Sequence, residues 1–467
     1  MSGWGDIVTA IDFVAHETTL FACIGFLMGG IDDLIVDLLF FAGLAVRRIR
    51  RSATVPRSLA LLPPPSRRLV LFVPAWDESR VIGHMLAAAL KRFDYPDYAI
   101  YVGTYPNDQA TIEVVADVAA RDPRVRLVVG DRPGPSTKAE CLNWLWQAML
   151  RDEAAGAPEA LAVVLHDAED VVHPSELRVY AAYAARHDVV QIPVLPLADP
   201  RSPYIAGHYL DEFAEAHGKQ MPVRGAIGAG LPLAGVGCAI RRSMLATIAH
   251  MRNAGPFDPE SLTEDYELGL TIRKLGGRGM FARVAESPGG PPVAVRAYFP
   301  ATIKTAVRQK TRWMVGIALA GWDRTGWAPL HHISDHWMRL RDRRALLAVL
   351  VLMAAYSALV VSTLAWGAHL IGGDRAPAMS ASLRAAMIAT FVLLVWRLGM
   401  RSAFVARHYG RREALRAVPR AVVSNIIAML AARRALVQYV AMLRGGEVRW
   451  DKTSHHFPAD LAKGDAT

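Results

Sequence analysis

Cysteine is scarce in this chain. The 467 residues include three cysteines, Cys23, Cys141 and Cys238, and no two of them form a CxxC pair. This excludes a disulfide framework and a zinc knuckle, and it indicates a reducing compartment for the soluble part. The first residues also lack a basic region followed by a small-residue cleavage site, so no cleaved signal peptide is predicted.

Acidic residues are fewer than basic residues. There are 53 Lys and Arg residues against 43 Asp and Glu, a formal net charge of +10. The chain lacks the interleaved aromatic and basic residues that bind single-stranded nucleic acid, so no nucleic-acid partner is predicted. Its arginines cluster at 47–51 and 339–344, beside apolar runs, which is typical of the cytoplasmic face of a lipid bilayer. A composition of 52% hydrophobic and 21% charged residues also indicates a membrane protein.

Two apolar runs are long enough to cross a membrane. Leu20–Val46 is the first, and because its Asp32, Asp33 and Asp37 would be costly in lipid, we expect one side of this helix to pack on other membrane helices and pair with arginine or a hydroxyl. An amphipathic interfacial helix is the alternative. The uncharged run Ala345–Ile371 is the second.

A third span is predicted over 382–400. Its Arg384 and Arg397 must snorkel or pair, and a pairing of one of them with Asp33 or Asp37 is one hypothesis. Residues 421–432 are short for a span and predict an interfacial helix, with a fourth span as the alternative. Three spans place the amino terminus outside and the soluble domain and carboxyl tail inside.

From Arg68 onward, short β-rich runs alternate with helical stretches. This alternation predicts an α/β fold with a mostly parallel, doubly wound sheet and right-handed crossovers. The predicted strands lie near 69–75, 98–104, 125–130, 161–167 and 188–193, and the predicted helices near 78–91, 110–120 and 137–151.

The strand at 161–167 ends in three carboxylates, Asp167, Glu169 and Asp170. A core cannot hold three acids within four positions, so they must emerge at the carboxyl edge of the sheet, where open α/β sheets bind ligands. On alternate positions, Asp167 and Glu169 can reach one hard divalent cation. The alternative is a solvated strand-to-helix loop with a capping aspartate.

Further candidates follow other predicted elements. Asp77 and Glu78, after the first strand, could accept hydrogen bonds from a nucleobase or ribose, or could cap a helix. Lys138 lies in the first turn of a helix, where the helix dipole disfavours a cation, so it is a phosphate candidate or a solvated lysine. The glycine-rich run 225–242 either approaches a ligand closely or forms a bend.

Two more candidates lie closer to the membrane runs. Asp265, at the start of a helix capped by Thr263, could take a proton from an attacking hydroxyl, although capping acids are frequent. Arg312 beside Trp313 suits phosphate neutralisation and sugar stacking, with interfacial anchoring of Trp313 as the alternative.

Taken in order, the motifs PAWDE, TKAECLN, HDAED, GVGCAIRR, TED and QKTRW resemble the inverting, processive family-2 membrane glycosyltransferases related to cellulose, chitin and hyaluronan synthases. More narrowly, LHDAEDVVHPSEL, LTEDYELGLTIRKLG and WDKTSHHFP resemble the bacteriophage adsorption protein B group of inner-membrane glycosyltransferases. The resemblance implies a GT-A-type, Rossmann-like mixed-sheet catalytic domain flanked by transmembrane helices.

The resemblance also implies roles for individual residues. Asp167 and Glu169 would hold Mg²⁺ or Mn²⁺ on the diphosphate of a nucleotide-sugar, and Asp265 would be the general base of an inverting displacement. The nucleotide side would comprise Asp77, Glu78, Lys138 and Asp167, and the acceptor and pyrophosphate side Glu264, Gln309, Arg312 and Trp313.

Two departures from the family pattern matter. The second strand continues as 102–108, VGTYPND, without the paired aspartates that help to read the base, so a UDP-sugar is expected by resemblance only. Glu169 replaces the more usual aspartate, which lengthens one ligand arm and affects metal preference.

The implied activity is elongation of an exopolysaccharide at the bacterial inner membrane, with a cytoplasmic catalytic domain and export through an outer-membrane partner. Alternatives are single-sugar transfer to a lipid carrier, a non-catalytic scaffold or receptor component, and a metal hydrolase using His166, Asp167, Asp170 and His173. Several relatives carry a carboxyl-terminal domain associated with cyclic di-GMP. We expect none here, and any regulation to come from a separate protein.

These expectations divide the chain into six parts. They are a transmembrane helix with its basic flank, a linker, the glycosyltransferase domain with its QxxRW helix, an interfacial segment, a transmembrane hairpin, and an interfacial helix with a cytoplasmic tail. Their boundaries are 1–51, 52–67, 68–320, 321–344, 345–409 and 410–467.

Overall fold

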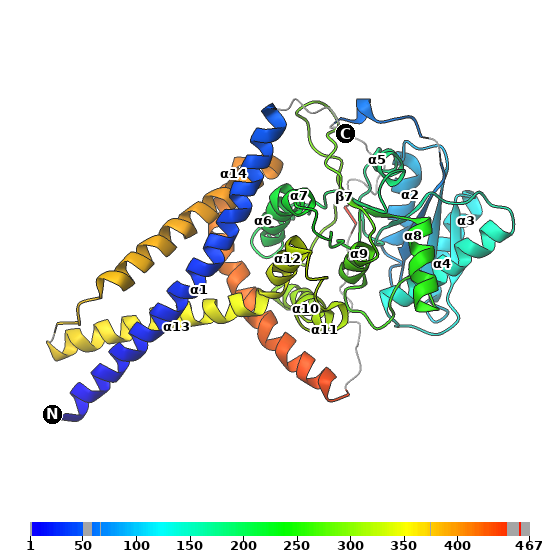
Figure 1. The fold of residues 1–467 in the computed structure, drawn as a ribbon. Coiled ribbons are helices and arrows are strands. Elements are labelled where there is room, and N and C mark those ends of the chain that lie inside the picture. The colour runs from blue at the N-terminus through cyan, green and yellow to red at the C-terminus, as the bar shows by residue number, and fades with distance from the viewer. Residues whose placement is uncertain (1, 50–57, 66, 374, 446–456, 459–467) are drawn as a thin grey trace.

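A seven-stranded mixed sheet lies at the centre of the globular domain in the computed structural model, which describes residues 2–49, 58–65, 67–373, 375–445 and 457–458 (Figure 1). The strand order is β3-β2-β1-β4-β6-β5-β7. β3, β2, β1 and β4 run parallel, whereas β6 is antiparallel to both of its neighbours. The strands are β1 Leu69–Pro74, β2 Tyr98–Thr104, β3 Val125–Val129, β4 Ala162–Leu165, β5 Val189–Gln191, β6 Cys238–Arg241 and β7 Gly279–Phe281.

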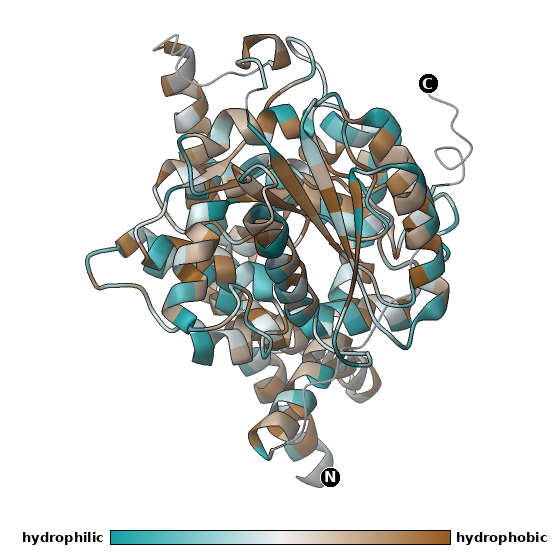
Figure 2. Ribbon diagram, turned by 90° about the vertical axis from the view of Figure 1, so that its right-hand side faces the viewer, coloured by the Kyte–Doolittle hydropathy of each residue, from teal (hydrophilic) through white to brown (hydrophobic). Residues whose placement is uncertain are grey.

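Helices cover both faces of this sheet. α2, α3 and α5 pack on one face, and α4, α8 and α9 pack on the other. β1 and β2 are buried along their whole length, as expected for central parallel strands, and Figure 2 shows the hydrophobic strands between the helical layers. The helices of these layers are α2 Ile82–Arg92, α3 Gln109–Arg121, α4 Lys138–Ala154, α5 Glu176–Ala184, α8 Arg242–Arg252 and α9 Glu264–Lys274.

The remaining elements link this domain to three long helices. They are η1 Leu59–Leu61, α6 Gly207–Glu215, η2 Ala216–Gln220, α7 Met221–Ala226, α10 Ile303–Trp313, η3 Met314–Leu319, α11 Ala320–Thr325 and α12 Ile333–Arg343. The long helices are α1 Ser2–Ile49, α13 Ala345–Gly372 and α14 Ala381–Leu443.

The α/β fold and its mixed sheet are confirmed, but the sequence did not predict two strands. β6 lies inside the glycine-rich run that was interpreted as a bend or a ligand loop, and β7 has three residues. Runs this short carry too little periodicity to be identified as strands. Gly235 and Gly237, both at positive φ, make the turn into β6, so the glycines bend the chain just before a buried central strand.

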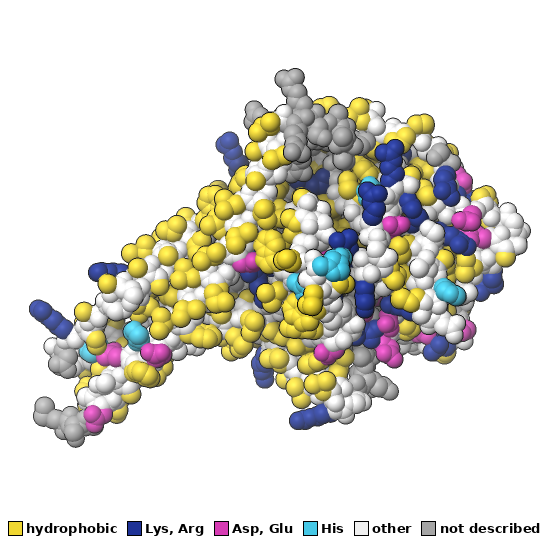
Figure 3. Space-filling model, in the orientation of Figure 1, with side chains coloured by type: hydrophobic (Ala, Val, Ile, Leu, Met, Phe, Trp, Pro, Cys, Tyr) yellow, Lys and Arg dark blue, Asp and Glu magenta, His cyan; other side chains and the backbone are white. Residues whose placement is uncertain are grey.

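α1, α13 and the part of α14 before Gly410 extend together away from the globular domain (Figure 1) and present a largely hydrophobic surface (Figure 3). Each is long and apolar enough to cross a membrane, by length and composition. α1 is longer than the predicted span at 20–46, and α13 matches the predicted second span. The chain therefore has the helices of a membrane protein, as the sequence predicts.

The aspartates of α1 are paired, as predicted. Asp33 contacts Arg341, Arg344 and Arg397, with nitrogen–oxygen distances of 2.9 Å to Arg341 and 2.6 Å to Arg344. Asp32 contacts the same two arginines of α12 and its C-cap. The contact between Arg397 and Asp33 confirms that an arginine of the third predicted span meets an aspartate of the first.

α14 combines two predicted segments. Gly410, at φ 83° and ψ 174°, interrupts the helix and separates the predicted third span from a second half that includes 421–432. Ile427 and Ala431 of this second half are buried, and the hydroxyl of Thr311 in α10 donates to the carbonyl of Ala431 (3.3 Å). Residues 52–57 and 66 of the predicted linker at 52–67, and most of the motif WDKTSHHFP, lie outside the described residues.

Candidate functional site

A cavity of about 420 Å³ opens at the carboxyl end of β4. Asp167 and Glu169 line it, and the side chain of Asp167 is 35% exposed. The strand ends at Leu165, so these residues lie on the following turn, which Asp170 closes by donating its backbone N–H to the carbonyl of Asp167 (3.2 Å). Both predicted ligand residues therefore face a cavity at the ligand-binding edge of the sheet.

A fully buried histidine supports this turn from behind. Nδ1 of His166 lies 2.8 Å from Oδ2 of Asp170, and its Nε2 lies 2.7 Å from Oε1 of Glu176. Burial opposes a charge on the imidazole, but Glu176 and Asp170 outweigh it and raise the pKa of His166 to about 10. His166 is thus committed to two carboxylates and does not reach the cavity.

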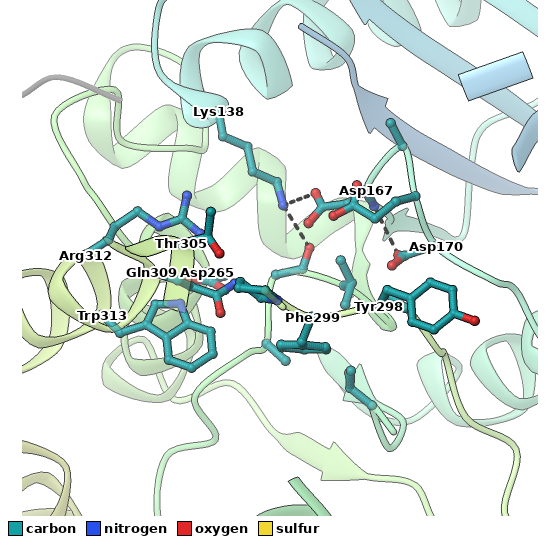
Figure 4. Close-up of a pocket in the computed structure, with 18 of the residues that line it drawn as sticks. Lys138, Asp167, Asp170, Asp265, Tyr298, Phe299, Thr305, Gln309, Arg312 and Trp313 are labelled. Carbon is teal, nitrogen blue, oxygen red and sulfur yellow. Dashed lines mark hydrogen bonds and ion pairs between the residues drawn. The ribbon is translucent and has the colours of Figure 1, made fainter. Parts of the chain in front are cut away.

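Lys138 enters the same cavity from the first turn of α4, after the cap formed by Thr137. Its ammonium group pairs with Asp167 and donates to the carbonyl of Gly235 (3.2 Å). Although burial opposes the charge, Asp167, Glu264 and Asp265 raise the pKa of Lys138, which keeps it cationic. The lysine that the sequence assigned to a phosphate is therefore held by the strand-end acid (Figure 4).

Asp265 lies across the cavity at the first turn of α9. Burial and then repulsion from Glu264 raise its pKa to about 7, against the opposing effect of Lys138. Gly235 adjoins it so closely that a Cβ there would lie 2.7 Å from Oδ2 of Asp265. A carboxylate that titrates near neutrality in a cavity has the property required of a general base.

Thr263 does not cap α9 through its side chain. Its hydroxyl donates instead to the carbonyl of Gly316 in η3, at 2.9 Å. A Cβ on Gly316 would lie 2.5 Å from the side chain of Thr263, so glycine permits this approach. The start of α9 is thereby fastened to the segment that follows α10.

α10 contributes the opposite wall of the cavity. Gln309, Arg312 and Trp313 line it together with Glu264 (Figure 4). A hydrogen bond from Thr305 closes the capping box of Thr302 at the start of α10, which fixes where the helix begins. All four residues predicted for the acceptor and pyrophosphate side thus share one cavity with Asp167 and Asp265.

The adjacent residues Asp77 and Glu78 have different environments. Glu78 is buried and lines the cavity, whereas Asp77 is exposed, has a positive φ of 53° and does not line it. The backbone N–H of Asp77 donates to Asp108 (2.5 Å), which also caps α3. The acid that ends the VGTYPND motif therefore fixes the loop after β1.

Several cavity residues had no signal in the sequence. Asp199, Arg201, Tyr298 and Phe299 come from loops outside the recognised motifs, and Trp76 lies within PAWDE but was given no role. Trp76 could have been suspected, because it directly precedes the acids of the first motif. Its indole packs edge-on against Tyr105, with ring centroids 5.0 Å apart.

The sequence of the globular domain matches a known enzyme family. The profile described as "Glycosyltransferase like family 2" matches residues 64–316, more than half of the chain. The chain therefore belongs to glycosyltransferase family 2.

Among curated proteins, the chain is similar to "Bacteriophage adsorption protein B" of Escherichia coli (strain K12) and to "Bacteriophage N4 adsorption protein B" of Escherichia coli O157:H7. It is 36% identical to each over 464 residues, which cover 92% of this chain and 61% of each relative. The narrower resemblance seen in the motifs is thus confirmed, and the chain spans about 61% of the length of these relatives.

Among solved structures, the mannosyltransferase PcManGT from Pyrobaculum calidifontis, in complex with GDP-Man and Mn²⁺, is similar with a TM-score of 0.55. The likeness covers 92% of this chain and 99% of the mannosyltransferase at 17% identity. At this identity the likeness establishes a common fold.

Proposed function

We propose that this enzyme transfers a sugar, with inversion and with help from a divalent metal, from a nucleotide-sugar to a growing exopolysaccharide at the bacterial inner membrane. One observation carries the proposal. The acids after β4, the carboxylate of Asp265, and Arg312 and Trp313 of α10 line a single cavity next to long apolar helices.

The residues at the end of β4 suit a hard cation. Asp167 and Glu169 offer carboxylate oxygens at the cavity wall, the donors that Mg²⁺ and Mn²⁺ accept. Within the described part of the chain, no group of three or more His, Cys, Asp or Glu side chains has the arrangement of a metal site. Two carboxylates therefore suit a cation whose remaining ligands come from the donor diphosphate and water. Such a cation, when bound, would neutralise charge on the departing diphosphate.

The chain's own side chains provide the other steps. Asp265, with its pKa of about 7, accepts the proton of the acceptor hydroxyl as that oxygen bonds to the anomeric carbon and the bond to the diphosphate breaks. Lys138 and Arg312 provide positive charge beside the leaving group. Displacement from the opposite face inverts the anomeric centre.

The acceptor side is suited to sugar rings. Trp313, Tyr298 and Phe299 place aromatic surface in the cavity, which favours contact with the apolar faces of a glycan. α10 lies against the second half of α14, so this wall of the cavity is close to the membrane helices. That proximity also favours a second candidate function, transfer of one sugar to a lipid carrier.

Product analysis separates these functions. Membranes containing the protein would be incubated with a panel of UDP- and GDP-sugars and Mg²⁺ or Mn²⁺, and both the released nucleotide and the product length would be measured. Products that lengthen with time support the polymer function, whereas a single addition to a lipid extract supports the second candidate. Failure to release nucleotide from any donor would contradict both functions.

A further inference from the structure

The three acids at the end of β4 have different environments. Asp167 and Glu169 line the cavity, whereas Asp170 is only 2% exposed. Oδ2 of Asp170 lies 3.1 Å from the backbone N–H of Asp167, which donates to it, and 2.8 Å from Nδ1 of His166. One carboxylate oxygen thus joins the buried imidazole to the backbone of the proposed metal ligand.

The second nitrogen of His166 extends this network into α5. Nε2 lies 2.7 Å from Glu176, and the other oxygen of Glu176 accepts the backbone N–H of His173 at 3.0 Å. The side chains of His166 and Glu176 are both fully buried. His166, which precedes the turn, is therefore bonded to α5, which follows the turn. The turn between them is held at both ends.

A buried network of this kind is costly unless all its members are satisfied. Here each contact fixes backbone around the turn that carries Asp167 and Glu169, and the mechanism proposed above does not use His166 itself. Residues that hold metal ligands from behind commonly alter metal affinity by about 10- to 100-fold when they are replaced. The network has the position that such a role requires.

We propose that His166 is a positioning residue of the donor site, which acts through Asp170 and Glu176 to hold Asp167 and Glu169 towards the cation of the donor diphosphate. This inference rests on the metal-dependent function proposed above. It assigns the buried histidine to metal and donor binding, whereas the proton transfer at Asp265 is left unchanged.

The test is direct measurement of Mn²⁺ binding to the solubilised full chain. Electron paramagnetic resonance would follow free Mn²⁺ in a titration, without and with UDP or GDP, for the wild type and for His166→Gln. Glutamine can bond to only one of the two carboxylates, so we expect Mn²⁺ affinity to fall by about 10- to 100-fold. At saturating Mn²⁺, kcat should fall by only about threefold, because Asp265 and the acceptor wall are intact.

The matched control is His187→Gln. His187 follows the carboxyl end of α5, the helix that carries Glu176. It is half-buried, and its ring bonds to the carbonyl of Tyr183, outside the network. This control should bind Mn²⁺ like the wild type. A purely structural role for His166 would reduce the yield or the unfolding temperature without changing the affinity of the folded fraction.

The outcomes are distinguishable. A wild-type chain that binds no Mn²⁺ with either nucleotide contradicts the metal part of the proposed function, and the inference falls with it. If the wild type binds Mn²⁺ and His166→Gln binds it with the same affinity, the inference is overturned, whereas the proposed function stands. If that variant does not fold, Glu176→Gln decides: a several-fold loss of affinity supports the inference, and an unchanged affinity overturns it.

Discussion

At the scale of single residues, the carboxylates of the cavity have distinct environments. Asp167 is partly exposed and paired with Lys138, Asp170 is buried against His166, and Asp265 faces Glu264 and Lys138. Asp167, together with Glu169, suits a cation, whereas the raised pKa of Asp265 suits proton transfer. Substitutions that change charge and preserve shape should therefore separate these roles.

Asp265→Asn removes the proposed base with little change in volume. Because general-base catalysis contributes about 10²- to 10⁴-fold, we expect kcat to fall by that factor while donor binding is retained. The measurements are sugar transfer and donor affinity on the same purified preparation. Transfer within tenfold of the wild type would show that another group takes the proton.

Glu264→Gln should change the pH dependence. Asp265 accepts a proton only when ionised, so the rate should rise with pH through about 7. Burial raises this pKa most and Glu264 next, so removing the charge of Glu264 lowers the pKa and moves the acidic limb of the profile to lower pH. A kcat/KM profile measured from pH 5 to 9 checks the shift. An unmoved limb would mean that Asp265 does not control it.

At the scale of elements, the junction between η2 and α1 joins the globular domain to the first long helix. Lys219 of η2 pairs with Asp37 of α1 and lies 2.9 Å from Glu215, and all three side chains are at most 8% exposed. Asp37 also accepts from Nε1 of Trp396 in α14, at 2.8 Å. Residues of η2, α1, α6 and α14 thus meet around one buried lysine.

Lys219→Met removes the cation that pairs with Asp37 and leaves the buried Glu215 with Arg401, 3.4 Å away. Breaking a buried ion pair from one side costs about 3–5 kcal/mol, so the unfolding temperature of the solubilised protein should fall clearly. Lys274→Met, at an exposed position at the end of α9, is the control and should leave it within experimental error. An unchanged unfolding temperature for Lys219→Met would contradict a structural role for this junction.

At the scale of the whole molecule, three apolar helices adjoin a polar domain. Arg341 of α12 and Arg344 contact Asp32 and Asp33 of α1 at the base of these helices, which is consistent with a membrane face there. The proposed topology places the amino terminus and the globular domain on opposite sides of the bilayer.

Labelling in intact cells tests this topology. All native cysteines are free and buried, so an introduced cysteine can be labelled selectively. An impermeant maleimide that crosses only the outer membrane should label Asp6→Cys in α1 but not Arg121→Cys in α3 until the inner membrane is opened. Labelling of both variants, or of neither, before opening would contradict the orientation.

The sequence by itself determined the order of strands and helices up to β5, the apolar helices, and the cavity residues that belong to the recognised motifs. These features are local: periodicity, strand-end acids and uncharged runs can be read from neighbouring positions. The sequence also showed that the aspartates of α1 need partners, because an unpaired carboxylate in a membrane helix costs free energy at any depth in the lipid.

Only the tertiary structure decided which of the predicted site residues face the cavity and which support it. β6 inserts antiparallel beside β4, and its preceding turn brings Gly235 between Lys138 and Asp265, a contact across about one hundred positions that no local pattern encodes. Likewise, His166 reads as an ordinary strand-end residue until folding encloses it between Asp170 and Glu176. Burial and charge proximity depend on long-range packing, and they set the pKa of Asp265 and separate the supporting acid from the two that face the cavity.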